Sequence, residues 1–280
     1  MYGTKLCVGL IGGANVSDRE QIRVFKQTGF DGFFAGWNKA LFDCKKAADE
    51  YGMFLQSVHG PFAHMPEIWA GGELGDKYTN QLIECVEDTA RVESPLVVFH
   101  PNCYVEKEPK VTKIGIENFH KVAKRAAEVG VKIAFENVEH IEYLEALMDS
   151  FVGDATVGFC WDTGHEMCFE PHVDHIARFG DRLLGVHLND NLGVKRFDGQ
   201  TAWSDDIHLL PFDGIRDWKK AMDSLNACGY NGVLTMEIGK NSRDDRHDND
   251  KYSRMSFYEY VAEVYARACR LAYMKNGMRG

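Results

Sequence analysis

Several features are absent from this sequence of 280 residues, and each absence excludes a class of protein. No segment approaches the roughly 18 consecutive apolar residues of a membrane-spanning helix, and the first residues carry no secretory-signal pattern. Proline is scarce, at 7 residues, and the 27 glycines follow no period, which excludes a collagen-like chain. The 8 cysteines form no C-x-x-C pair, so we predict reduced, mostly buried thiols and a cytoplasmic location.

Positively charged residues are fewer than negatively charged ones. Lys and Arg total 32 against 42 Asp and Glu, which gives a formal net charge of −10. Surfaces that bind phosphate backbones or anionic lipid are basic, so this balance argues against nucleic-acid and membrane partners. The hydrophobic fraction of 45% and the aromatic fraction of 12% exclude intrinsic disorder. A small polar substrate stays compatible with the net charge.

Short apolar runs alternate with amphipathic segments along the whole chain, which is the pattern of strands alternating with helices. The predicted strands are Leu6–Ile11, Gly32–Ala35, Met53–Val58, Leu96–Phe99, Lys132–Phe135, Thr156–Trp161, Leu183–Leu188 and Gly232–Ile238. The predicted helices are Asp18–Thr28, Lys39–Tyr51, Tyr78–Val92, Ile114–Val129, Ile141–Ser150, Val173–Phe179, Ile215–Cys228 and Phe257–Met274.

Eight such units indicate the α/β class and a single (β/α)8 barrel, with residues 1–280 as one domain. A doubly wound open sheet is the alternative, but the turn after the first strand lacks the G-x-G-x-x-G pattern. Two long strand-to-helix connections, 60–77 and 189–214, belong on the C-terminal face of the barrel, where active sites lie.

Acidic and imidazole side chains end six consecutive predicted strands, directly after their apolar residues. The motifs are H-G-P at 59–61, H-P at 100–101, E-N at 136–137, D-T-G-H at 162–165, H-L-N-D at 187–190 and M-E at 236–237. A D-x-H motif at 206–208 adds two more such residues. Clustered carboxylates repel one another unless a cation or protons intervene. This set of oxygen and nitrogen ligands therefore predicts a divalent metal site for Mn²⁺, Mg²⁺, Co²⁺ or Zn²⁺.

The order and spacing of these motifs resemble the xylose isomerase-like TIM-barrel superfamily, and the resemblance covers nearly the whole chain. This superfamily includes sugar phosphate isomerases and epimerases, inosose dehydratases, and the family 2 AP endonucleases such as endonuclease IV. The resemblance implies a metal-dependent isomerase or epimerase of a sugar, keto-sugar or cyclitol, or a related lyase such as an inosose dehydratase.

The resemblance to ketose 3-epimerases assigns roles to particular residues. Glu136, Asp162, His187 and Glu237 match their single-metal site, and His165 matches the histidine that contacts substrate oxygens. Glu136 and Glu237 would be the acid/base pair that removes and returns a carbon-bound proton. The bound metal would stabilise the resulting enediolate.

The remaining motif residues match the other metal sites of endonuclease IV. His59 and His100 join Glu136 in the first of these sites, and His165, Asp206 and His208 form the other, so up to three metals are compatible with the sequence. The resemblance therefore leaves an AP endonuclease as an alternative. The net charge opposes it, because a protein that binds duplex DNA needs a basic face.

Aromatic residues near the predicted mouth are candidates for the walls of a sugar pocket, because sugar rings present apolar C–H faces. We single out Trp37, Phe62 and Trp203 as these wall candidates. The predicted partner is a small-molecule sugar, and a homo-oligomer is compatible with the resemblance.

Overall fold

The computed structural model describes residues 3–103, 110–193, 203–243 and 247–277, except for the side chain of Trp203. The strands are β1 (Leu6–Gly9), β2 (Gly32–Gly36), β3 (Phe54–His59), β4 (Leu96–Phe99), β5 (Lys132–Glu136), β6 (Val157–Asp162), β7 (Leu183–Leu188) and β8 (Leu234–Met236). The α-helices are α1 (Asp18–Thr28), α2 (Leu41–Tyr51), α3 (Met65–Ala70), α4 (Gly72–Arg91), α5 (Lys113–Val129), α6 (Ile141–Ser150), α7 (Thr163–Cys168), α8 (His175–Phe179), α9 (Trp218–Ala227), α10 (Asp250–Ser253) and α11 (Phe257–Gly277). Two 3-10 turns, η1 (Gly180–Arg182) and η2 (Trp203–Asp205), complete the described elements.

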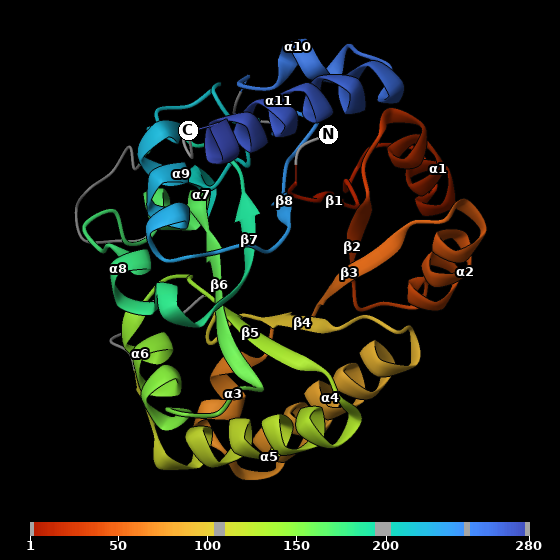
Figure 1. Ribbon diagram of the computed structural model, residues 1–280. Coiled ribbons are helices and arrows are strands. Elements are labelled where there is room, and N and C mark those ends of the chain that lie inside the picture. Colours follow the sequence, from red (N-terminus) through yellow and green to blue (C-terminus); the bar gives the residue numbers. More distant parts are fainter. Residues whose placement is uncertain (1–2, 104–109, 194–202, 244–246, 278–280) are drawn as a thin grey trace.

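The eight strands form a closed parallel barrel in sequence order, and the helices surround it (Figure 1). Strand β8 pairs with β1, with Leu234 opposite Leu6 and Met236 opposite Val8, and this pairing closes the ring. The predicted (β/α)8 barrel is therefore confirmed. Among the described helices, none is long and apolar enough to cross a bilayer.

The pleat of the strands carries polar side chains to one end of the barrel. Val98, Ala134 and Cys160 belong to a small buried cluster formed by β4, β5 and β6. Side chains two residues apart on a strand share a face. The next position on that face of β5 is Glu136, and on β6 it is Asp162, the last residue of each strand. The apolar interior therefore ends where the acidic residues begin.

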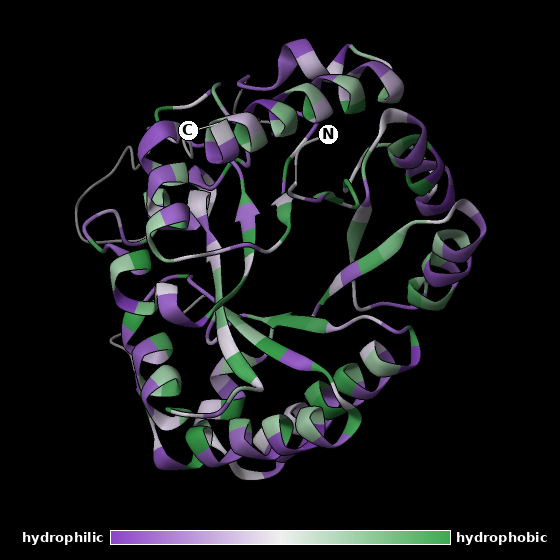
Figure 2. Ribbon diagram, in the orientation of Figure 1, coloured by the Kyte–Doolittle hydropathy of each residue, from purple (hydrophilic) through white to green (hydrophobic). Residues whose placement is uncertain are grey.

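The outer helices are amphipathic, with hydrophobic and hydrophilic residues around each circumference (Figure 2). Helix α1 begins and ends where the sequence predicts. Its N-cap, Ser17, accepts a hydrogen bond from the amide of Glu20, and its C-cap, Gly29, adopts the left-handed conformation at φ 118°. Ile22 and Phe25 are fully buried on the face that packs inward.

Three short helices lie where the sequence analysis placed connections or assigned nothing. Helix α3 occupies part of the predicted connection 60–77, with Pro66 in its first turn, and α4 begins six residues before its predicted start at Tyr78. Helix α7 begins directly after β6, because Asp162 both ends the strand and caps the helix by accepting the amide of His165. Helix α10 follows a charged stretch, and its Tyr252 is buried at 1% exposure.

Candidate metal centre

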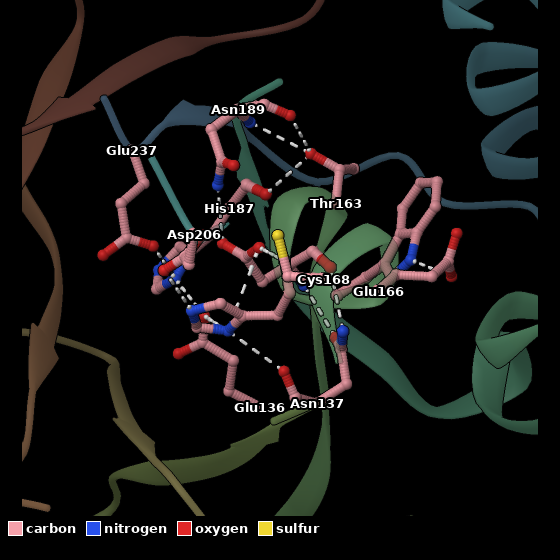
Figure 3. A network of polar contacts seen from close by, with 12 residues as sticks. Glu136, Asn137, Thr163, Glu166, Cys168, His187, Asn189, Asp206 and Glu237 are labelled. Atoms are coloured by element: carbon pink, nitrogen blue, oxygen red, sulfur yellow. Dashed lines mark hydrogen bonds and ion pairs between the residues drawn. The ribbon is translucent and has the colours of Figure 1, made fainter. Parts of the chain in front are cut away.

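All nine predicted ligands lie at the C-terminal mouth of the barrel, in three clusters whose candidate ligand atoms each lie within 4.8 Å of one another. The strand ends contribute six of these ligands, α7 contributes His165, and the loop after η2 contributes Asp206 and His208. Figure 3 shows Glu136, His187, Asp206 and Glu237 converging on one region from separate segments. Their roles as ligands stay predictions.

The first cluster joins His59, His100 and Glu136. The Nε2 atoms of His59 and His100 lie 3.3 Å and 3.4 Å from Oε2 of Glu136. This carboxylate is 0% exposed. Phe62 stacks on the His100 ring, with centroids 4.8 Å apart, and meets the edge of His59. The two imidazoles are thus held against one shared oxygen.

The central cluster contains Glu136, Asp162, His187 and Glu237. Nδ1 of His187 lies 2.9 Å from Oε1 of Glu136 and 2.8 Å from Oε2 of Glu237, so the imidazole stands between the two glutamates. Phe34 stacks on the opposite side of this ring at 4.9 Å. Glu136 therefore belongs to two clusters at once.

The third cluster is His165, Asp206 and His208. Oδ2 of Asp206 lies 3.3 Å from Nε2 of His165 and 2.7 Å from Nε2 of His208. His208 adopts a left-handed backbone conformation, at φ 49°, which turns the loop toward the cluster.

Three of the histidines are oriented by backbone carbonyl groups. The Nδ1 atoms of His59, His165 and His208 lie 3.0, 3.0 and 3.2 Å from the carbonyl oxygens of Gly60, Asn137 and Glu237. A proton on Nδ1 would complete each bond and leave Nε2 as the acceptor that faces the carboxylates. This is the arrangement that metal-ligating histidines adopt.

Asparagine side chains hold the acidic residues in place. Nδ2 of Asn189 donates to Oδ2 of Asp162 at 2.8 Å, and Nδ2 of Asn191 donates to Oδ1 of Asp206 at 3.1 Å. The Asn137 amide exchanges two hydrogen bonds with the backbone of Asp162, each at 2.8 Å. Asn137 and Asn189 belong to the E-N and H-L-N-D motifs, but the sequence offers no reason to assign them a role, and Asn191 lies just beyond the second motif.

Burial and neighbouring charges set the pKa values of the acidic residues. Burial raises the pKa of Asp162 to about 7, and the nearby Glu136 and Glu237 contribute to this rise. Burial acts in the same direction on Glu237, but His187 outweighs it and lowers the pKa of Glu237 to about 2. His187 and His100 similarly hold the pKa of Glu136 well below its ordinary value.

The neighbouring carboxylates shift the pKa values of the histidines upward. Burial alone would lower the pKa of His187, yet Glu237 and Glu136 raise it well above its ordinary value. Asp206 overcomes burial in the same way and raises the pKa of His208 to about 10. The imidazolium charges therefore compensate the clustered carboxylates, which is the role that a bound cation would otherwise take.

The donor set fits a divalent metal. Oε2 of Glu136 and Nε2 of His100 are buried, and their 3.4 Å contact does not have the geometry of a hydrogen bond. The partner of Oε2 of Glu237 is the His187 imidazole at 2.8 Å. Buried polar atoms normally have a partner. Oxygen and imidazole nitrogen donors without thiolate suit Mn²⁺, Zn²⁺, Co²⁺ or Mg²⁺.

A cavity of about 250 Å³ opens beside the clusters, slightly smaller than the roughly 300–1,000 Å³ of ordinary ligand pockets. Phe62 lines it, and its role as a wall of a sugar pocket stays a prediction. Trp37 instead donates its indole N–H to Asp88 of α4 at 3.0 Å and is not among the described residues that line the cavity. The side chain of Trp203 lies outside the described structure. Five other lining residues had no predicted role at the site: Cys103, Val138, Glu139, Phe169 and Arg243.

The chain is similar to a known protein family and to several curated proteins. The family model described as xylose isomerase-like TIM barrel matches residues 22–256. The uncharacterized protein y4fM of Sinorhizobium fredii is 32% identical over 201 residues, which cover 68% of this chain and 58% of that protein. Inosose dehydratase of Geobacillus thermodenitrificans is 24% identical over 149 residues, 47% of this chain and 50% of the enzyme. The chain thus spans little more than half the length of these curated relatives.

Among solved structures, D-psicose 3-epimerase of Clostridium cellulolyticum superposes with a TM-score of 0.72 at 15% identity. The superposition covers 96% of this chain and 99% of the epimerase. At this level of identity, the likeness concerns the fold.

Proposed function

Because this chain belongs to the xylose isomerase-like TIM-barrel family, we propose that it is a divalent-metal-dependent isomerase or epimerase that acts on a sugar, keto-sugar or cyclitol. The observation that carries this proposal is the pair Glu136 and Glu237, whose carboxylates lie 2.9 Å and 2.8 Å from Nδ1 of His187 and so flank one imidazole at the mouth of the barrel. Relatives that include an inosose dehydratase, and structural neighbours that include a sugar epimerase, support this class of chemistry.

Glu136, Asp162, His187 and Glu237 would hold the metal. A divalent cation there would stabilise the negative charge that develops on adjacent substrate oxygens when a neighbouring carbon loses its proton. The protein must then supply a base and an acid. Glu136 and Glu237 have lowered pKa values, so both are ionised at neutral pH and able to accept a proton. One would take the proton from the substrate carbon and become protonated. The other would first gain a proton from solvent and then deliver it to the carbon.

Exchange of a substrate C–H proton with solvent deuterium tests this assignment. Glu136→Gln and Glu237→Gln should each reduce the exchange at least about 100-fold, the lower bound usual for loss of acid/base catalysis. Glu84→Gln, at an exposed position on α4, is the matched control and should exchange as the wild type does. Undiminished exchange in both active-site variants, with circular dichroism unchanged, would disprove the two-carboxylate mechanism.

A lyase is the close variant of this chemistry, in which the same charge-stabilised species expels a hydroxyl group from the next carbon. The similarity to inosose dehydratase favours testing it. The mass of the product separates the two, because an epimerase conserves the substrate mass and a dehydratase lowers it by one water.

The three-cluster arrangement favours a second candidate, a metal-dependent AP endonuclease, because three metals suit phosphodiester hydrolysis. The net charge of −10 opposes it. Incision of DNA containing an abasic site by the zinc-loaded protein would support the nuclease. Metal content per chain gives independent evidence, since three zinc ions favour the nuclease and one ion favours the sugar enzyme.

We further propose a small-molecule sugar as the partner, a cytoplasmic location and residues 1–280 as one domain. Six of the eight cysteines are buried, which is consistent with the predicted reduced thiols. A homo-oligomer stays a prediction that light scattering would test.

A further inference from the structure

The mouth of the barrel contains a second cavity beside the first. It measures about 300 Å³ and lies over the ends of β8, β1 and β2, whereas the cavity of about 250 Å³ lies over β3 to β6. Glu237, His208 and Arg243 line both cavities. The two are therefore halves of one cleft, which meet at the proposed acid/base residue. We call them the neutral half, over β8, β1 and β2, and the metal half.

The two halves differ in chemistry. The metal half is lined by four histidines, whereas glycines, aliphatic residues and side-chain amides make up most of the lining of the neutral half. Gly9, Gly12 and Gly239 bring the backbone to the cavity surface. The Arg243 guanidinium at the junction donates to the carbonyl oxygens of Ser204 and Asp206, so both terminal nitrogens already have an acceptor in the protein. This lining suits a neutral, hydroxylated group better than a phosphate.

A buried acceptor in the neutral half lacks a donor. Asn249 lines this cavity and is only 3% exposed. Its Nδ2 donates to the carbonyl of Gly239 at 3.1 Å, and its backbone N–H donates to Oγ of Ser242 at 3.0 Å, so the residue is fixed in place. Its Oδ1 accepts no hydrogen bond from the described residues. Such an atom normally has a partner. A ligand hydroxyl in the neutral half would supply one once the Asn249 amide turns its oxygen toward the cavity, because Oδ1 is closed to solvent in this structure.

We propose that the substrate has two parts. A sugar or cyclitol ring reacts in the metal half, and a second neutral hydroxylated ring, joined to it by a glycosidic bond, occupies the neutral half. This inference rests on the proposed function, because that function places the reacting ring beside Glu237. It narrows the substrate class from a free monosaccharide to a glycoside or disaccharide.

Binding of matched sugars to the Mn²⁺-loaded protein tests the proposal. The probes are D-fructose with isomaltulose, and myo-inositol with galactinol, so each pair compares a ring with the same ring carrying a second sugar. Gly12→Phe serves to fill the neutral half, since a Cβ on Gly12 would meet nothing within 4 Å. Gly3→Phe is the matched control, because Gly3 is exposed, lies outside both cavity linings and is equally unobstructed.

In calorimetry, the dissociation constant of at least one two-ring probe for the wild type should be at least tenfold lower than that of its parent ring. Gly12→Phe should remove this gain and leave the affinity for the parent ring within twofold, while Gly3→Phe keeps the gain. Absence of a gain in both pairs, or a gain that persists in Gly12→Phe, would overturn the proposal. Deuterium exchange is measured on the same four sugars. Absence of exchange counts against the proposed reaction alone, and the binding comparison still decides whether a second ring is bound.

Discussion

Replacing Asp190 by asparagine should destabilise the protein severely, although the two side chains have nearly the same shape. Asp190 lies just after β7 and is 0% exposed. Its Oδ1 accepts the backbone amides of Asn191 at 3.0 Å and Arg216 at 3.1 Å. Its Oδ2 accepts the backbone amide of Phe212 at 3.0 Å and the indole N–H of Trp218 at 2.8 Å. Four donors thus converge on one carboxylate.

An asparagine side chain has one acceptor oxygen and one NH₂ group, which only donates. Whichever way the amide is turned, two of the four N–H groups around residue 190 therefore lose their acceptor. Hydrogen bonds to a charged group contribute about 1.5–3 kcal/mol each. The expected loss for Asp190→Asn is therefore about 3–6 kcal/mol of unfolding free energy, a large part of the ~5–15 kcal/mol of a typical protein.

Urea unfolding, followed by circular dichroism, measures this loss from the midpoint and slope. The control is Asp223→Asn, which removes an exposed ion pair with Lys219 at 2.6 Å on α9 and should cost less than about 0.5 kcal/mol. If Asp190→Asn costs no more than about 1 kcal/mol, close to the control, the four hydrogen bonds do not anchor the 206–216 loop and the reasoning is refuted.

Two further predictions concern the metal centre. Because the pKa of His187 is raised well above its ordinary value, the metal-free protein holds a proton there that a metal must displace. Mn²⁺ binding should therefore release protons and tighten as the pH rises from about 6 to 8, and calorimetry in two buffers of different ionisation enthalpy checks this; equal heats in both buffers would contradict it. A Cβ on Gly164 would lie 1.8 Å from Oδ1 of Asn189, the residue that orients Asp162. Gly164→Ala should accordingly weaken metal binding by about 10-fold or more, whereas Gly3→Ala, with nothing within 4 Å of its Cβ, should bind as the wild type does.

The regular part of the fold follows closely from the sequence, because the apolar periodicity that predicts each strand is also what buries it. Helices α1 and α6 match their predicted bounds at both ends. Strand β8 is shorter than the predicted Gly232–Ile238, since only Leu234–Met236 pair with β1 and only Thr235 and Met236 also pair with β7. Helices α3, α7 and α10 have four to six residues, too few for a periodic pattern to emerge.

The candidate site could be predicted because a parallel barrel aligns all strand ends, so residues far apart in sequence must meet at one mouth. The contacts that hold the site residues in place could not be predicted from the sequence. Asp190 and Asn249 lie in segments without periodicity, and their partners depend on how the 206–216 loop folds back and on how Asn249 returns to Gly239. The sharing of Glu136 between two clusters likewise depends on side-chain conformation rather than on spacing.

The pairing of β8 with β1 has a consequence for the order in which the protein folds. Leu6 and Leu234 are among the most distant partners along the chain, and contacts of such long sequence separation form slowly because a large loop must close first. Glu237 follows directly on this last strand. A nascent chain could assemble His59, His100 and Glu136 early, yet the central cluster is complete only after the ring has closed. During refolding, the recovery of metal affinity at the central cluster would therefore report when β8 has paired with β1 and the barrel has closed.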